Sequence, residues 1–202
     1  MSRRHTLRAP DRRDRPPLLR LPAAGGAGAG AARGASSGAR VGAVAPERCG
    51  GCGRAIDGGT AACRAEFDAA CAFDFGGGVP WELHRLMVDA YALQHPDDFC
   101  ASGKSLAAHL AGALAGIEHD GRRAVHRALR DRLDGPRDLE RPDAPADRGG
   151  VTIAALAGAD SPEARAEAIR RWARSAFEAW GARHALARRW LAEALSARRE
   201  RC

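Results

Sequence analysis

The chain has 202 residues, enough for one domain with a substantial core. No stretch approaches the ~18 uncharged apolar residues of a membrane span, so we expect no membrane segment. The formal net charge of +7 is confined to the start of the chain, because residues 1–48 contain ten arginines and only three acidic residues. From totals of 32 basic and 25 acidic residues this leaves 22 of each for the rest, so the later part has no charge excess that would favour nucleic acid.

Residues 1–47 consist mainly of arginine, proline, glycine and alanine. Because such a segment cannot bury enough apolar surface to offset its ordering entropy, we expect a disordered tail. The Arg3-Arg4 pair is typical of a twin-arginine export signal, but further arginines interrupt the segment behind it, so we expect a cytoplasmic protein. The tail is then a solvated extension, a translation start placed too far upstream, or a basic arm. Nucleic acid is expected as a partner only through such an arm.

Beyond the tail, glycine and proline separate a series of helical patterns. Cys49-Gly-Gly-Cys52-Gly53 predicts a tight knuckle, because glycines permit the sharp backbone turn. Apolar residues then recur at three- and four-residue steps in four successive segments, a spacing typical of amphipathic helices. We predict these helices at about 61–73, 81–96, 102–118 and 122–133, with a turn at Gly76-Gly77-Gly78 and short connections that favour antiparallel neighbours.

The second half of the chain contains a loop and further helical stretches. Residues 134–150 are charged and rich in proline, which predicts a surface loop, and a brief helix follows from Thr152. Ser161-Pro162-Glu163 is a strong helix-start signal. The apolar stripe behind it carries three of the four tryptophans, which this spacing places in the core, and Gly181 is a predicted break. We therefore predict an all-α protein, a small antiparallel bundle over residues 48–198 with the CxxC knuckle at its N-terminal edge.

The knuckle supplies two thiols of a predicted metal site. Zinc takes four convergent ligands, and a Cys-x-x-Cys pair provides two of them. If the 61–73 and 81–96 helices pair about the glycine turn, Cys63 lies beside position 92, and His95 is within one turn of that position. A redox pair and unreactive free thiols remain alternatives for the knuckle. The predicted zinc site is of the Cys3His type, with the ligands Cys49, Cys52, Cys63 and His95.

A second polar cluster lies on the 81–96 and 102–118 helices. His84, Tyr91 and His109 can meet inside the bundle when these helices pair, with Asp89 near by and Lys104 one to two turns before His109. The cluster is either a hydrogen-bonded network that fixes the helix register, or a site in which histidines hold a metal or act as acid and base. No catalytic residue is assigned, and these five are the candidates. The remaining histidines are expected at the surface: His5, His119, His126 and His184.

The residues of both clusters also carry a family resemblance. It rests on the Cys49-x-x-Cys52-Gly53 knuckle with Cys63, the segment from His84 to Pro96, the Lys104-Ser105-x-x-x-His109-Leu110-x-Gly112 block and the late tryptophans. From about Cys49 to about Leu195 the chain resembles a bacterial family, domain of unknown function 5946. The resemblance implies a small cytoplasmic protein in which these residues recur, with no reaction attached. The long arginine-rich extension departs from that pattern.

Two functions follow from the residues. In the first, the metal is structural and replaces missing core contacts, and the bundle is an interaction or regulatory module that binds a protein or a small molecule. The predicted ligands close the coordination shell, which favours this interpretation. In the second, the chain is a hydrolase that uses His84 and His109 in the bundle interior, with a metal or as acid and base. Both interpretations stay open.

Overall fold

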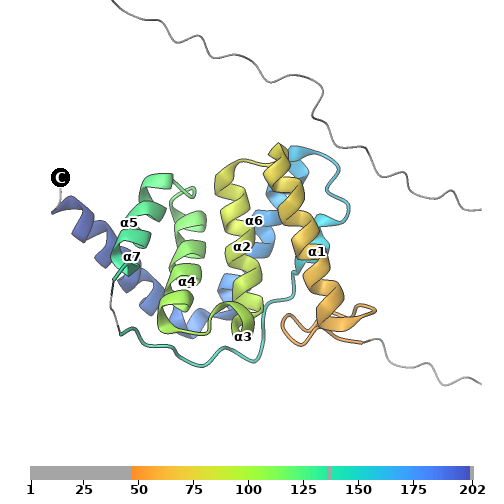
Figure 1. Ribbon diagram of the computed structural model, residues 1–202, viewed down its shortest axis with the longest axis horizontal. Helices are drawn as coiled ribbons and strands as arrows, with labels where there is room; N and C mark the ends of the chain where they lie inside the picture. The colour runs from red at the N-terminus through yellow and green to blue at the C-terminus, as the bar shows by residue number, and fades with distance from the viewer. Residues whose placement is uncertain (1–46, 136–137, 201–202) are drawn as a thin grey trace, which may run out of the picture. The chain divides into compact units, whose positions relative to one another are not determined.

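The computed structural model describes residues 47–135 and 138–200. It confirms the predicted all-α class, because within these ranges the chain forms seven α-helices and no strand apart from one bridge between Arg48 and Ala55. Residues 1–46 of the predicted tail lie outside the described residues. The elements shown in Figure 1 are α1 Gly59–Phe73, η1 Asp74–Gly78, α2 Trp81–Gln94, α3 Pro96–Phe99, α4 Gly103–Glu118, α5 Arg123–Leu133, η2 Ile153–Leu156, α6 Pro162–Ala179, η3 Gly181–Arg183 and α7 His184–Arg199.

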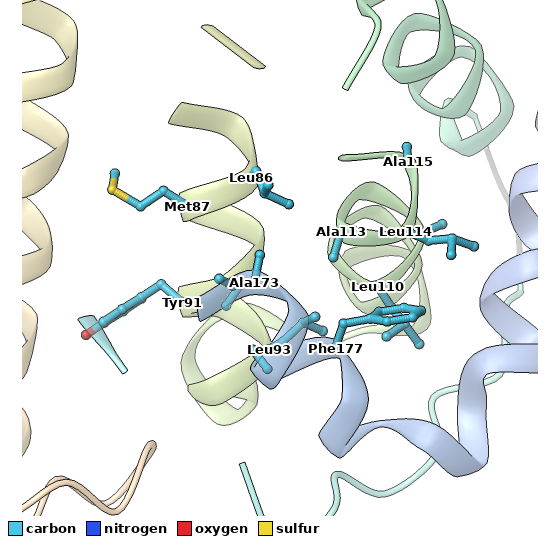
Figure 2. Close-up of a cluster of buried hydrophobic side chains, with 14 of the residues drawn as sticks. Leu86, Met87, Tyr91, Leu93, Leu110, Ala113, Leu114, Ala115, Ala173 and Phe177 are labelled. Atoms are coloured by element: carbon cyan, nitrogen blue, oxygen red, sulfur yellow. The ribbon is translucent and has the colours of Figure 1, made fainter. Parts of the chain in front are cut away.

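Helix α2 is central to the packing of the helices (Figure 1). Both α4 and α6 pack along it, and Phe67 of α1 stacks on Tyr91 with ring centroids 3.8 Å apart. Figure 2 shows Met87 and Tyr91 pointing from α2 toward α1, while Leu86 points toward α4. Nine of the 14 residues of α2 are buried. The helix therefore has little solvent face, and its polar side chains must find partners inside the protein.

Side-chain caps fix where α4 and α6 begin. Ser102 accepts a hydrogen bond from the Ser105 backbone N–H, and the Ser105 hydroxyl accepts one from the Ser102 N–H. Ser161 accepts a hydrogen bond from the Ala164 N–H, with Pro162 in the first turn of α6. Such caps satisfy backbone donors that the helix itself leaves unpaired. The predicted start signal at Ser161 is confirmed, and so is the break at Gly181, where η3 separates α6 from α7.

The predicted helix 81–96 ends earlier than expected, at Gln94. A proline disfavours helical backbone in the residue before it, and His95 accordingly has φ −124° and ψ 55°, outside the helical region. Pro96 then begins the short helix α3. His95 therefore lies at the junction of α2 and α3. Because its backbone is not helical, its side chain can point in a direction that neither helix would give it.

The predicted turn at Gly76-Gly77-Gly78 is also different in the structure. These glycines belong to η1, a single π-helical turn that continues directly from α1. Single π turns occur where a helix accommodates a local packing demand. Here the turn carries Asp74, which is buried and pairs with Arg165 of α6 at 2.8 Å. The chain reverses only after this pair, at Val79 and Pro80.

Gln94 connects a predicted surface loop to the core. Its amide nitrogen donates to the carbonyls of Arg148 at 2.8 Å and Val151 at 2.9 Å, and its Oε1 accepts from Trp172 Nε1 at 2.8 Å. The end of the loop expected at residues 134–150 is therefore attached to the core by hydrogen bonds. The tryptophans predicted for the core are confirmed, since Trp172, Trp180 and Trp190 are at most 4% exposed.

Replacing Gln94 with methionine tests this connection. The variant keeps the size of the side chain but leaves the Trp172 N–H and the two loop carbonyls without their partner. Because a buried polar group left unpaired costs about 1–3 kcal/mol, we expect the free energy of unfolding to fall by about 3 kcal/mol in denaturant titration. Glu178→Met, at an exposed position of α6, is the control and should change it by less than about 0.5 kcal/mol. Equal losses in both variants would contradict the role given to Gln94.

Candidate metal centre

The segment before α1 folds back on itself and brings two thiols to one point. The Cys49 N–H donates to the Arg54 carbonyl at 2.9 Å, and the Gly53 N–H donates to the Cys49 carbonyl at 2.9 Å. Gly53 has φ +72°, a left-handed conformation that glycine adopts without strain. The Gly50 N–H donates to the Thr60 hydroxyl at 2.8 Å, which fastens the knuckle to the start of α1.

Helix α1 and the end of α2 supply the other two groups. Cys63 lies in α1, and His95 is the residue that follows α2. Together with Cys49 and Cys52 they form a buried set whose sulfur and nitrogen atoms all lie within 4.8 Å of one another. We call this set the Cys3His cluster. The structure brings together the four residues that the sequence analysis proposed, and the cluster could hold a metal ion.

The distances inside the Cys3His cluster are those of groups around a common point. Nε2 of His95 lies 3.3 Å from Cys49 Sγ and 3.6 Å from Cys63 Sγ. Cys52 Sγ and Cys63 Sγ are 3.8 Å apart. A disulfide bond would place two sulfurs about 2.05 Å apart, so these cysteines are free thiols. The atoms are close enough to share one ion and too far apart to be bonded to each other.

A backbone carbonyl aims the His95 ring at the thiols. His95 Nδ1 is 2.9 Å from the Tyr91 carbonyl oxygen, and since a carbonyl can only accept, Nδ1 carries the proton. Nε2 is thereby left facing the sulfurs. The Tyr91 ring also stacks on the His95 ring at 3.9 Å, and Phe67 covers the other face of Tyr91. Histidines that bind metals are oriented in this way, through a hydrogen bond at the second ring nitrogen.

Hydrogen bonds within the cluster lower the pKa of two of its three thiols. A hydrogen bond from Cys63 lowers the pKa of Cys52 to about 4 against the opposing effect of burial, with a further bond from His95. Burial opposes ionisation of Cys49, yet two backbone N–H groups and His95 outweigh it and lower its pKa. Hydrogen bonding to Cys52, together with burial, raises the pKa of Cys63. Since the thiolate is the form that binds metals, these contacts shift Cys49 and Cys52 toward that form.

Asp89 and His109, from the second predicted cluster, lie together between α2 and α4. His109 Nδ1 is 2.9 Å from the Asp89 carboxylate, and Arg85 is 2.8 Å from it. The Asp89 side chain is fully buried. A Cβ atom added at Gly112 would lie 2.6 Å from the same carboxylate. Helix α4 can therefore approach Asp89 this closely because residue 112 is glycine.

The structure does not bring His84, Tyr91 and His109 to one point. His84 Nδ1 lies 3.4 Å from Asp74, and Tyr91 belongs to the aromatic stack beside the Cys3His cluster. Positions 84 and 91 are seven residues apart, so they share the side of α2 that faces α1 and η1, whereas position 89 faces α4. The fifth candidate, Lys104, donates to the Gly135 carbonyl.

Several interior polar residues were missed or misplaced by the sequence analysis. Arg165 donates to Asp74 through two guanidinium nitrogens, at 2.8 and 3.1 Å. Neither residue stands out in the sequence, because arginine supplies nearly all of the 32 basic residues. His126, expected at the surface, is half-buried and packs edge-on against Trp81 at 5.3 Å. His119 and His184 are half-buried as well, and His5 lies outside the described residues.

Comparison with known proteins adds one match. A family model described as a family of unknown function (DUF5946) matches residues 47–181, more than half of the chain, and covers the whole Cys3His cluster. No match of significance was found among curated proteins or among solved structures. Within residues 47–135 and 138–200, no helix is long and apolar enough to cross a membrane.

Two neighbouring glycines of the knuckle give a matched test of the cluster's packing. A Cβ atom at Gly51 would lie 2.1 Å from Cδ2 of His95, whereas one at Gly50 meets only the Thr60 hydroxyl oxygen, at 3.4 Å. Gly51→Ala should therefore displace the His95 ring and lower the free energy of unfolding by about 2 kcal/mol. Gly50→Ala should lower it by less than about 0.5 kcal/mol. Denaturant unfolding compares the two, and equal stabilities would contradict the geometry described.

Two arginine–aspartate pairs with the same spacing test the buried network. Asp89 is fully buried beside Arg85, whereas the side chain of Asp68 is 59% exposed beside Arg64. Asp89→Ala leaves Arg85 and His109 without their carboxylate, which should destabilise the fold by about 3 kcal/mol. Asp68→Ala should cost less than about 0.5 kcal/mol, because exposed pairs contribute little. A comparable effect of both substitutions on the melting temperature would argue against the network.

Proposed function

Because the chain belongs to a family of unknown function (DUF5946), we propose its function from its own residues. It is a zinc-binding helical protein in which Cys49, Cys52, Cys63 and His95 hold one ion as a structural clip. The bundle acts as an interaction or regulatory module, and the ion itself takes no part in a reaction. The observation that carries this proposal is the mutual spacing of the four buried ligand atoms.

The spacing supports a single tetrahedral ion. With zinc–sulfur bonds of about 2.3 Å and a zinc–nitrogen bond of about 2.0 Å, a tetrahedral centre separates two sulfurs by about 3.8 Å and a sulfur from a nitrogen by about 3.5 Å. The Cys52 and Cys63 sulfurs are 3.8 Å apart. His95 Nε2 lies 3.3 and 3.6 Å from the sulfurs of Cys49 and Cys63. These three separations match those around a single zinc ion, and all four atoms lie within 4.8 Å of one another.

The donor chemistry supports zinc over other common metals. Thiolates and imidazole are soft to borderline ligands, whereas magnesium and calcium take oxygen ligands. Three cysteines with one histidine is an established combination for structural zinc. The Tyr91 carbonyl completes the arrangement, because it holds the His95 ring in the tautomer that offers Nε2 to a metal.

Burial supports a structural role for the ion. The four residues are 0–8% exposed, and four protein donors fill a tetrahedral shell. A catalytic zinc site keeps one position for water or substrate instead. Zinc in this cluster joins the knuckle to α1 and to the end of α2, three segments that are separate in the sequence. The binding free energy of the ion then contributes directly to folding of the N-terminal edge.

Because the closed metal shell leaves no position for a substrate, we assign the bundle a role in binding a partner and not in catalysis at the metal. Two large apolar side chains are well exposed where α1 runs into η1, Phe73 at 58% and Phe75 at 81%. Neighbouring exposed apolar side chains are typical of surfaces that contact other molecules. The partner of the proposed module is another protein or a small molecule.

One observation favours the alternative, a hydrolase. In the buried Asp89–His109 pair a carboxylate orients an imidazole, as in acid–base sites. In this alternative His109 is the acid or base, and His84 contributes from the separate pair that it makes with Asp74. His84 contacts Asp74 of η1 at 3.4 Å, whereas His109 lies in α4. The two histidines would therefore act at different places in the bundle.

Metal content of three purified proteins tests the proposal against this alternative. We expect one zinc per chain in the full-length protein, because four donors are already in place. Cys52→Ser should lose the ion, since serine is a poor zinc ligand. His109→Ala should retain it, because His109 lies with Asp89 and not with the thiols. Elemental analysis of dialysed protein gives the ratios, and metal that survives Cys52→Ser but leaves with His109→Ala would place the ion in the bundle interior.

A further inference from the structure

A pocket of about 670 Å³ is lined mainly by residues of α2, α4 and α5. In Figure 1, α4 lies between α2 and α5. We call this pocket the α5 pocket. Its volume is in the range of small-molecule sites, roughly 300–1,000 Å³. Asp134 is the one acidic residue in its lining among the described residues. Its basic lining residues are Arg85 of α2, Lys104 of α4, and Arg123, Arg127 and Arg130 of α5.

The three arginines of α5 form one face of that helix. Their spacing of four and then three residues places them side by side along the pocket. Arg123 lies 3.6 Å from Glu82, and Arg130 lies 3.5 Å from Asp131, both in solvent-exposed pairs that contribute little and exchange easily. Arg127 has no ion-pair partner within residues 47–135 and 138–200. The positive charge of this face is thus available to a ligand.

The two basic residues on the opposite walls are held in place. Arg85 is anchored by the buried carboxylate of Asp89 at 2.8 Å and donates to the Ala108 carbonyl at 3.2 Å. Lys104 donates to the Gly135 carbonyl, a neutral partner that leaves its charge uncompensated. A ligand that binds between these walls loses little free energy to ordering them, because both are ordered beforehand.

One end of the α5 pocket is aromatic. The Arg123 guanidinium lies 5.2 Å from the centre of the Trp81 ring, and His126 packs edge-on against the same ring. His126 Nε2 is buried and has no hydrogen-bond partner among the described residues. Such a nitrogen in a pocket wall gains a partner when a polar ligand enters.

We propose that the α5 pocket binds a small phosphate-bearing molecule, with the phosphate near Arg123 and Arg127 and the remainder of the ligand against Trp81. Guanidinium groups suit this chemistry because their planar donors bind phosphate oxygens in pairs. A nucleic-acid duplex suits it less, because the five basic residues come from three helices and line a pocket instead of an outer face. The proposal does not depend on the metal in the Cys3His cluster.

Inorganic pyrophosphate, titrated into the full-length protein, is the probe. Calorimetry gives its affinity, and acrylamide quenching locates it, because Trp81 is 37% exposed whereas the other three tryptophans are at most 4% exposed. We expect saturable binding that protects Trp81 from acrylamide. Arg127→Gln should weaken binding about tenfold or more through loss of a charged hydrogen bond. Arg171→Gln, at an exposed position of α6 outside the pocket, should retain wild-type affinity.

Three results would overturn the proposal. The first is the absence of saturable binding throughout the millimolar range. The second is equal weakening by Arg127→Gln and Arg171→Gln, which would show a general charge effect. The third is displacement of pyrophosphate by a short DNA duplex at lower concentration than pyrophosphate itself requires, with the same loss in Arg127→Gln, which would assign the surface to a nucleic-acid backbone. Both substituted positions are exposed, so folding of the variants is expected to be unchanged and can be checked by circular dichroism.

Discussion

The arrangement of the N-terminal edge depends on the hydrogen bond between His95 Nδ1 and the Tyr91 carbonyl. Pro96 takes His95 out of the helix, and this bond then sets which ring nitrogen faces inward. With Nε2 inward, the ring presents its unprotonated nitrogen to the point where the knuckle and α1 bring three sulfurs together. Gly51 passes so close to the ring that a methyl group would collide with it. The proline, the carbonyl and the glycine thus act on one side chain, and through it on the attachment of the knuckle to the bundle.

The polar residues of α2 direct its neighbours in a similar way. Asp89 faces α4 and holds Arg85 and His109, while Gln94 joins α6 to the loop before η2. Each group is satisfied by a partner from another element, so it adds specificity to a helix whose apolar surface alone would allow several packings. Arg85 has a second role, because the same bond that satisfies Asp89 positions it in the wall of the α5 pocket. The interior network and the proposed ligand site are therefore connected through one side chain.

The sequence predicted that the four early amphipathic helices exist, and it located helix ends well where local signals mark them, as at Ser161 and Gly181. The meeting of Cys63 and His95 was also predictable, because pairing two helices about a turn needs only counting from the turn. The π turn at Asp74 was not, because it accompanies a pair with Arg165 that is 91 residues away. Of the second cluster, Asp89 and His109 lie together as expected, whereas residues 84 and 91 face a different neighbour of α2. The α5 pocket could not be predicted, because it is lined by three helices and the apolar periodicity of each helix does not determine how the three are placed relative to one another.

The central claim is that the Cys3His cluster holds a structural zinc ion with no open position. X-ray absorption at the zinc edge of the full-length protein tests it most directly, because it counts sulfur and nitrogen or oxygen neighbours around the ion. The account predicts three sulfurs at about 2.3 Å and one nitrogen at about 2.0 Å, without a bound water. Two sulfurs with two or more light neighbours would contradict it, because zinc would then keep a position for solvent or substrate.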